Sequence, residues 1–504
     1  MEAFHHLLLS FKIALDPINL FLCFCGALIG TFVGVLPGLG PAASMSLLLP
    51  LTFTLSPVQA LIFLSGIYYG AMYGGSTTSI LVNIPGEAAS VVTCLDGYQM
   101  AQKGRAGPAL GVAAIGSFVA GTFSVVMLML LGPPISKIAI KFGPPEFVSL
   151  SFLGLTLVTY LASGSMIKAL IMACVGLLLG FIGVDIVTGV DRFTLGISVL
   201  LDGVGLVPVV MGLFGISEVM LNLEQAYERA EISPQKIQNI WPNRKDLKES
   251  AGAITRGSIL GFFLGIIPGG GALLASFMSY AVEKKVSKEP ETFGQGNIRG
   301  VAGPESANNA GAGGAFVPLL TLGIPCNVIM ALLMGGLMIH GVEPGPRLIV
   351  GHPEVFWGVV GSMYLGNGML LVINLPLIGI WVKILKLRYS LLFPLILFFC
   401  LIGAYTTGNT VYDIYVMMVF GVAGYLMKKF GYEPAPLVLA LVIGPIMERA
   451  FRQSLIISSG SPWIFVSRPI SAVFVFAAIL ILVSPVILKL LGKSRLMQMS
   501  EERK

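Results

Sequence analysis

The sequence predicts an all-α integral membrane protein of about ten to twelve transmembrane helices, in two inverted-topology repeats with interrupted helices and re-entrant hairpins. Three observations lead to this fold class: the composition, an internal repeat, and glycine–proline interruptions inside apolar segments. Of 504 residues, 55% are hydrophobic and 11% are charged, whereas soluble domains carry about 25% charged residues. Because a span needs about 20 apolar residues, the chain has room for many spans.

Charge and residue usage leave little basis for an enzyme. The net charge of +6 fits basic cytoplasmic loops better than a nucleic-acid partner. The six cysteines form no C-x-x-C pair, the four histidines form no H-E-x-x-H pair, and no phosphate-loop motif is present. The opening MEAFHHLLLSFKIALDP lacks the basic leader and cleavage site of a signal peptide. We therefore expect a non-enzyme without a cofactor.

An internal repeat divides the chain. The stretch GTFVGVLPGLG (30–40) aligns with GFFLGIIPGGG (261–271) at an offset of 231 residues, and GGSTTSILVNIPG (74–86) aligns with GAFVPLLTLGIPC (314–326) at an offset of 240. A third match, IGSFVAGT with VGSMYLGN, follows in the same order at an offset of 245. We predict a first membrane repeat over 1–221, a cytoplasmic polar linker over 222–250, and a second repeat with a short cytoplasmic tail over 251–504.

Loop charges indicate the orientation of the repeats. Five basic residues precede segment 251–282 and four follow it, whereas the equivalent first-half segment has only Lys12 before it and no Lys or Arg over 51–67. Because cytoplasmic loops are enriched in Lys and Arg, the two segments are expected to face opposite sides of the membrane. This favours inverted repeats and a re-entrant hairpin at 251–282. Two full spans are the alternative interpretation.

The interrupted segments are the first candidate binding elements. Proline removes a backbone donor and glycine permits close approach, so Pro37, Gly38 and Gly40 should break a helix at membrane depth, and the second repeat offers Gly269, Gly270 and Gly271. Irregular backbone survives there only when it is buried in protein or lines a cavity. Free N–H groups would suit an anion and free carbonyls a cation such as Na⁺. Simple helix bending is the alternative.

Short polar side chains form the second candidate element. Hydroxyls and amides beside glycine supply donors for a carboxylate, although Ser and Thr in helices often bond their own backbone. Among the few carboxylates in apolar surroundings we single out Glu305. Others, including Glu87, lie beside Gly or Pro and are interpreted as loop ends, and Glu448 with Arg449 as a structural ion pair. The predicted residues of this element are Gly74, Gly75, Ser76, Thr77, Asn83, Pro85, Glu305, Asn308, Asn309 and Pro325.

The motifs GVLPGLGP, IYYGAMYGGSTTSILVNIPGEAASVVTCLDGYQMAQKGRAGPAL and GPESANNAGAGGAFVPLLTLGIP, followed by GVEPGP, carry a resemblance. From about residue 20 to about residue 470 the chain resembles the large membrane subunit of the tripartite tricarboxylate transporter family. The resemblance implies a multi-pass permease of the bacterial inner membrane, with a small four-span membrane subunit and a periplasmic substrate-binding protein as partners. It further implies uptake of carboxylates, such as citrate or aromatic acids, driven by an ion gradient, with Na⁺ as the expected coupling ion.

The same resemblance carries the family's motifs onto Pro37–Gly40, Gly74–Ser76, Asn83–Gly86 and Pro304–Asn309. The chain departs from the family pattern at Gln99, where proline is common, and at Cys326, where glycine often follows Ile-Pro. Similarity to other two-repeat carboxylate symporters suggests an elevator-type movement and a homodimer. The alternatives are a channel or exporter that works without a binding protein, an intramembrane enzyme and a scaffold subunit.

Overall fold

The computed structural model describes residues 2–36, 40–162, 165–185, 187–225, 237, 239–385 and 389–490. The first half contains the helices α1 (Glu2–Ala14), α2 (Pro17–Val35), α3 (Gly40–Leu48), α4 (Pro57–Val82), α5 (Val91–Thr93), α6 (Gln99–Gln102), α7 (Ala106–Ala139), α8 (Pro144–Leu161), α9 (Met166–Gly180), α10 (Leu206–Val210) and α11 (Ser217–Gln225). A π-helical segment, Met211–Ile216, joins α10 to α11. The antiparallel strands β1 (Gly183–Val184) and β2 (Asp191–Arg192) form a small hairpin after α9.

The second half is also helical. Its helices are α12 (Arg244–Gly265), α13 (Gly271–Val286), α14 (Arg299–Gly314), α15 (Phe316–Leu322), α16 (Val328–Ile339), α17 (Leu348–Gly351), α18 (Pro353–Asn374), α19 (Ile378–Ile384), α20 (Tyr389–Gly408), α21 (Val411–Lys429), α22 (Ala435–Ile457), α23 (Ile464–Ser467) and α24 (Pro469–Leu490).

Six helices in the described part of the chain are long and apolar enough to cross a membrane: Pro17–Val35, Ala106–Ala139, Pro144–Leu161, Leu206–Glu224, Pro353–Asn374 and Val411–Lys429. Four shorter apolar helices accompany them: Met166–Gly180, Val328–Ile339, Phe393–Gly408 and Pro469–Ser484. The prediction of an all-α integral membrane protein is confirmed. The total of ten to twelve spans, the inverted orientation of the repeats and the boundaries at 221 and 251 stay predictions.

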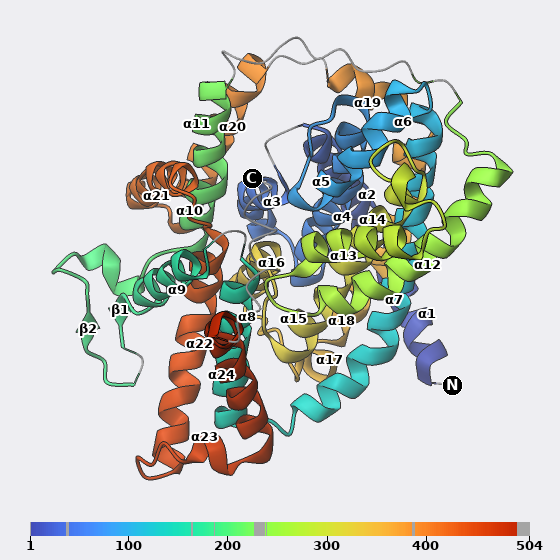
Figure 1. The fold of residues 1–504 in the computed structure, drawn as a ribbon. Coiled ribbons are helices and arrows are strands. Elements are labelled where there is room, and N and C mark those ends of the chain that lie inside the picture. Colours follow the sequence, from blue (N-terminus) through green and yellow to red (C-terminus); the bar gives the residue numbers. More distant parts are fainter. Residues whose placement is uncertain are drawn as a thin grey trace.

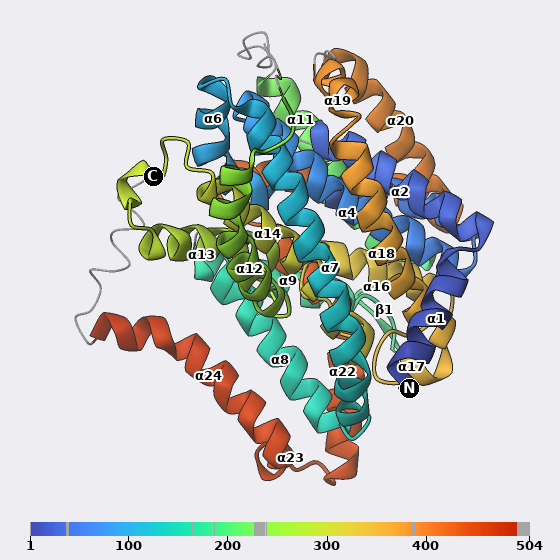
Figure 2. The ribbon, with the colours of Figure 1, turned by 90° about the vertical axis from the view of Figure 1, so that its right-hand side faces the viewer.

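The helices gather into two groups that we name for use below. The glycine group comprises α2, α4, α7, α12, α13, α14 and α18, and the outer group comprises α8, α9, α22 and α24 (Figure 1). In the second view α24 runs beside α8 at the edge of the molecule (Figure 2). Helix α16 packs against both α4 and α22, and helix α3 packs against α4, α16 and the π-helical segment.

Glycines let the helices of the glycine group touch backbone to backbone. A methyl group on Gly30 of α2 would overlap the backbone of Ile67 in α4, and one on Gly261 of α12 would overlap Ala307 in α14. The glycines of α2 and α12 make these contacts in matching order: Gly26 with Phe63, Gly30 with Ile67, Gly34 with Ala71, Gly257 with Gly303, Gly261 with Ala307, and Gly265 with Gly311. Small residues four apart are the usual means of close helix approach in membranes. The two helix pairs are related by the same offsets, 231 and 240, as the sequence alignment.

The predicted interruptions are present in the described residues. Helix α12 ends at Gly265 and α13 begins at Gly271, while α2 ends at Val35 and α3 begins at Gly40. Gly40 and Gly271 have φ values of 57° and 41°, in the left-handed region that glycine tolerates best. Pro37 and Gly38 lie outside the described residues.

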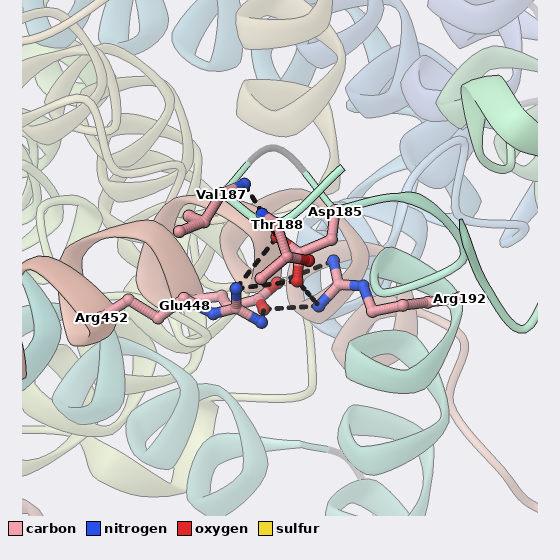
Figure 3. A network of polar contacts seen from close by, with 6 residues as sticks. All are labelled: Asp185, Val187, Thr188, Arg192, Glu448 and Arg452. Carbon is pink, nitrogen blue, oxygen red and sulfur yellow. Dashed lines mark hydrogen bonds and ion pairs between the residues drawn. The ribbon is translucent and has the colours of Figure 1, made fainter. Parts of the chain in front are cut away.

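An ion-pair network joins the β1–β2 hairpin to α22 (Figure 3). The guanidinium of Arg192 lies 2.6 Å from the Glu448 carboxylate, and that of Arg452 lies 2.7 Å from both Glu448 and Asp185. Asp185 also accepts the backbone N–H of Val187 at 2.8 Å. The predicted pairing of Glu448 with Arg449 is not among the ion pairs of the described residues, because Glu448 instead faces two arginines, one of them from the hairpin.

This network should keep the β1–β2 hairpin attached to α22 as the pH is lowered, down to strongly acidic pH. The Val187 N–H and the Arg452 guanidinium lower the pKa of Asp185 to about 2, below the usual value of about 3.9. Stabilisation by Asp185 is therefore complete above about pH 4 and is lost as the pH falls through about 2. Hydrogen exchange, corrected for its intrinsic pH dependence, should show the Val187 amide protected near pH 6 and unprotected near pH 2. In Asp185→Asn the protection should already be weak near pH 6; equal protection in both proteins would contradict this role.

Candidate functional site

A cavity of about 730 Å³ lies where the interrupted segments of both halves meet. Four segments, 40–43, 85–89, 269–273 and 326–329, which comprise loops and the helix starts that follow them, form one part of its wall. The opposite part comes from α8, the π-helical segment, α11, and the end of α21 with the start of α22. The cavity thus lies between α4 and α13 of the glycine group and α8 and α22 of the outer group.

Several helices begin at this cavity. The first residues of α3, α13, α16 and α22 all line it, and Asn327 caps α16 by accepting the N–H of Met330 at 2.9 Å. The first four N–H groups of a helix have no partner within the helix, and the helix dipole adds a partial positive charge at the same end. Four such ends around one cavity create a binding site suited to an anion.

Charged side chains add less positive charge to the cavity wall than these backbone groups do. Lys428 lines the cavity but lies 2.5 Å from the carboxylate of Glu218, which also lines it. The residues that line the cavity in the described part of the chain include no arginine and no histidine. Besides Lys428, the charged side chains that line the cavity are the carboxylates of Glu87, Glu218 and Glu433, so most of the positive charge on its wall comes from helix N-termini.

The predicted glycine and proline residues divide between the wall and the interior. Five of the predicted residues line the cavity: Gly40, Pro85, Gly269, Gly270 and Gly271. Thr77 and Pro325 are buried away from it, and Gly74 packs against the backbone of α2. Pro37 and Gly38 cannot be placed, because they lie outside the described residues.

Asn83 has a backbone role in this structure. Its side chain is exposed, and its φ of 58° ends α4 in the left-handed conformation. Gly323 ends α15 in the same way with a φ of 70°. Asn and Gly are the residues that most readily adopt this conformation at a helix end, which explains why they occupy equivalent positions of the repeat.

The predicted polar residues form a buried cluster directly behind the cavity. Glu305 on α14 accepts hydrogen bonds from the hydroxyls of Ser76 and Thr93. Its neighbour Asn309 donates to the Ser117 hydroxyl at 2.7 Å. Asn308 donates at 3.0 Å to the carboxylate of Glu87, whose side chain packs against Gly75 and lines the cavity. The predicted cluster therefore reaches the cavity through Glu87.

Sequence reasoning missed Glu87 and Asn327 as cavity residues. A signal was present, because each follows directly on a matched motif, Ile-Pro-Gly in the first half and Ile-Pro-Cys in the second. Extending the alignment by one residue at the offset of 240 pairs Glu87 with Asn327. Cys326, the departure from the family pattern, lines the cavity beside Asn327.

No group of three or more His, Cys, Asp or Glu side chains that could hold a metal ion occurs among the residues that the structure describes. Backbone carbonyl oxygens lie at the C-terminal ends of α2 and α12, next to the loops that line the cavity. The Thr78 hydroxyl donates to the carbonyl of Val35 at 2.9 Å, at the C-terminal end of α2. At the equivalent end of α12, the Cys326 thiol lies 3.7 Å from the carbonyl of Ile266.

Comparison with known proteins gives the chain its family. Residues 20–439 match the family described as tripartite tricarboxylate transporter TctA. The chain is 51% identical over 472 residues to an Agrobacterium vitis protein described as an uncharacterized 52.8 kDa protein in the TAR-I ttuC' 3' region, with 94% of each chain covered. A second Agrobacterium vitis protein, described as lying in the TAR-II ttuC' 3' region, is 51% identical over 212 residues, which cover 42% of this chain and 88% of the relative.

No solved structure is significantly similar to the chain. The family match spans most of the sequence, and this family consists of transporter subunits rather than enzymes. The chain belongs to the tripartite tricarboxylate transporter TctA family, as its large membrane subunit.

Proposed function

We propose that this subunit imports a di- or tricarboxylate such as citrate, or another organic acid, across the bacterial inner membrane. The small four-span membrane subunit and a periplasmic substrate-binding protein would complete the transporter. The observation that carries the proposal is the convergence of four helix N-termini on one cavity. Carboxylates are stabilised by unpaired N–H groups and by the positive end of the helix dipole.

The size and lining of the cavity support a small acid as substrate. Its volume of about 730 Å³ lies within the range of about 300–1,000 Å³ that small-molecule sites occupy. Pro41, Val158 and Leu439 provide apolar contacts in the wall. A ligand would therefore have its carboxylates at the helix ends and its carbon skeleton against apolar side chains.

Na⁺ is the coupling ion that we propose. The C-terminal ends of α2 and α12 present carbonyl oxygens next to the loops that line the cavity. Discontinuous helices of secondary transporters hold Na⁺ at such ends. Symport would then use helix N-termini for the anion and nearby carbonyls for the cation. The position of the cavity between the glycine group and the outer group is compatible with an elevator-type movement of one against the other, in a monomer or a homodimer.

Uptake of radiolabelled citrate into proteoliposomes tests this proposal. The full chain, reconstituted with its small subunit and binding protein, should accumulate citrate with an inward Na⁺ gradient and not with an equal K⁺ gradient. Accumulation of any tested acid without the binding protein would favour a free-standing permease or channel. Equal uptake with both cations would contradict Na⁺ symport.

A further inference from the structure

Two carboxylates in the buried cluster lack a basic partner. Glu87 is 8% exposed and Glu305 is fully buried, and within the described residues neither forms an ion pair with Lys, Arg or His. Asn308, one turn after Glu305 on α14, hydrogen-bonds to Glu87, so both carboxylates belong to one cluster. Burying two unpaired negative charges is costly. The cluster therefore needs a source of positive charge.

Glu87 and Asn308 show where that charge would bind. Both oxygens of Glu305 accept hydroxyl hydrogen bonds, whereas Oε2 of Glu87 and Oδ1 of Asn308 are buried without a hydrogen-bond partner. Both atoms are acceptors when the carboxylate is ionised. What this side of the cluster lacks is a donor.

A proton would supply both the missing donor and a positive charge, and it needs fewer ligands than a metal cation. Protonation of Glu87 adds one O–H donor and removes one of the two negative charges. A hard metal cation needs a shell of about six oxygens, while Glu87 and Asn308 contribute one unpartnered oxygen each. Glu87 lines the cavity, so a proton can reach it from the aqueous phase.

The other titratable groups around Glu87 do not replace the proton. Lys428 faces the cavity from α21 but is paired with Glu218. On α13, Tyr280 donates to Asp96 and Glu283 is paired with Arg256. The other titratable groups that line the cavity or lie beside the cluster include Tyr68, Tyr69, Tyr73, Cys94, Glu305, Cys326, Tyr432 and Glu433.

The residue equivalent to Glu87 in the second repeat indicates which protonation state of Glu87 favours substrate binding. Asn327 occupies the position equivalent to Glu87 and also lines the cavity. An amide is neutral and can donate, as a protonated carboxylic acid can. With Glu87 protonated, both loops line the cavity with uncharged side chains. An ionised Glu87 would instead repel an anionic substrate.

We propose that Glu87 is a proton-binding site, and that its protonated form is the one that accepts a substrate carboxylate. The proton comes from water, forms an O–H bond at the Glu87 carboxylate, and returns to water when the substrate leaves; no other bond changes. The second half of this inference rests on the proposed function and adds a proton to its transport cycle.

Infrared spectroscopy of the purified full chain tests the proton site without a substrate. The carbonyl stretch of a protonated carboxylic acid is resolved from that of a carboxylate. The wild type should show this band, and raising the pH should remove it. Glu87→Gln should lack the band, while Glu354→Gln, which changes an exposed carboxylate at the start of α18, should keep it. An unchanged band in Glu87→Gln would overturn the assignment.

A second variant keeps the test decisive if Glu87→Gln does not fold. In Glu305→Gln the neighbouring negative charge is gone, so Glu87 should lose its proton, and the band, at lower pH than in the wild type. A band that titrates as in the wild type would overturn the assignment.

Transport measurements test the coupling. The KM for citrate uptake should rise with pH more steeply in the wild type than in Glu87→Gln. The ionisation of citrate itself affects the KM of both proteins equally, so it does not contribute to the difference between them. Identical pH profiles would contradict the coupling. A wild type that shows the infrared band but transports no acid would contradict the proposed function and still support the proton site.

Discussion

Replacing Gly30 or its counterpart Gly261 with alanine is expected to destabilise the folded chain strongly. The new methyl group would overlap backbone atoms of Ile67 or Ala307 in the neighbouring helix, and a backbone atom cannot rotate away as a side chain can. Overpacking of this kind typically costs about 1–3 kcal/mol and occasionally more. We therefore expect a lower unfolding temperature and less monodisperse protein in detergent for both variants.

Gly368→Ala is the matched control for these two substitutions. Gly368 lies in α18, and no atom beyond the adjacent backbone of its own helix lies within 4 Å of the position that its Cβ would take. The same change from glycine to alanine there should leave stability unchanged or raise it slightly, because alanine favours the helix. Equal unfolding temperatures for Gly30→Ala, Gly261→Ala and Gly368→Ala would contradict the close helix contact.

Ala42→Asp should nearly abolish carboxylate uptake while the protein stays folded. Ala42 is the third residue of α3, is partly exposed and lines the cavity. A carboxylate in the first turn stabilises a helix, so the substitution should not weaken α3. It would repel the substrate: two charges about 5 Å apart at an effective dielectric constant of about 20 interact by about 3 kcal/mol. That energy corresponds to a loss of roughly 100-fold in apparent affinity.

Ala42→Asn provides the control, because asparagine has nearly the same size as aspartate and no charge. The variant should retain most of the uptake of radiolabelled citrate, measured as KM in proteoliposomes. Leu273 is the repeat equivalent of Ala42 at the start of α13 and also lines the cavity, so Leu273→Asp should be worse than Leu273→Asn. Equal KM values within each Asp–Asn pair would argue against an anion at these helix ends.

The sequence predicted the fold class and the paired interruptions because both depend on local composition and repetition. The offsets of 231 and 240 found in the alignment recur in the contacts of Gly30 with Ile67 and of Gly261 with Ala307. Replacing a glycine that faces a neighbouring helix would destabilise the fold. The same spacing of glycines therefore occurs in both halves of the sequence, where the alignment detects it.

The composition of the cavity could not be predicted in the same way. Glu87 was interpreted as a loop end because it follows Pro and Gly, and only the packing of its loop against α14 brings it to Asn308. The N-terminus of α22 reaches the cavity through long-range packing that has no counterpart in local sequence. Similarly, Glu448 pairs with Arg192, which lies 256 residues away, rather than with its sequence neighbour.

The carboxylate is proposed to bind in the cavity between the two interrupted segments. The most direct measurement is a structure of the full chain determined with a transported acid bound. We expect a carboxylate of the ligand against the first backbone N–H groups of α3 or α13, within the cavity that Gly40 and Gly271 line. A ligand bound instead in the smaller cavity of about 170 Å³ between the β1–β2 hairpin and α22 would contradict it.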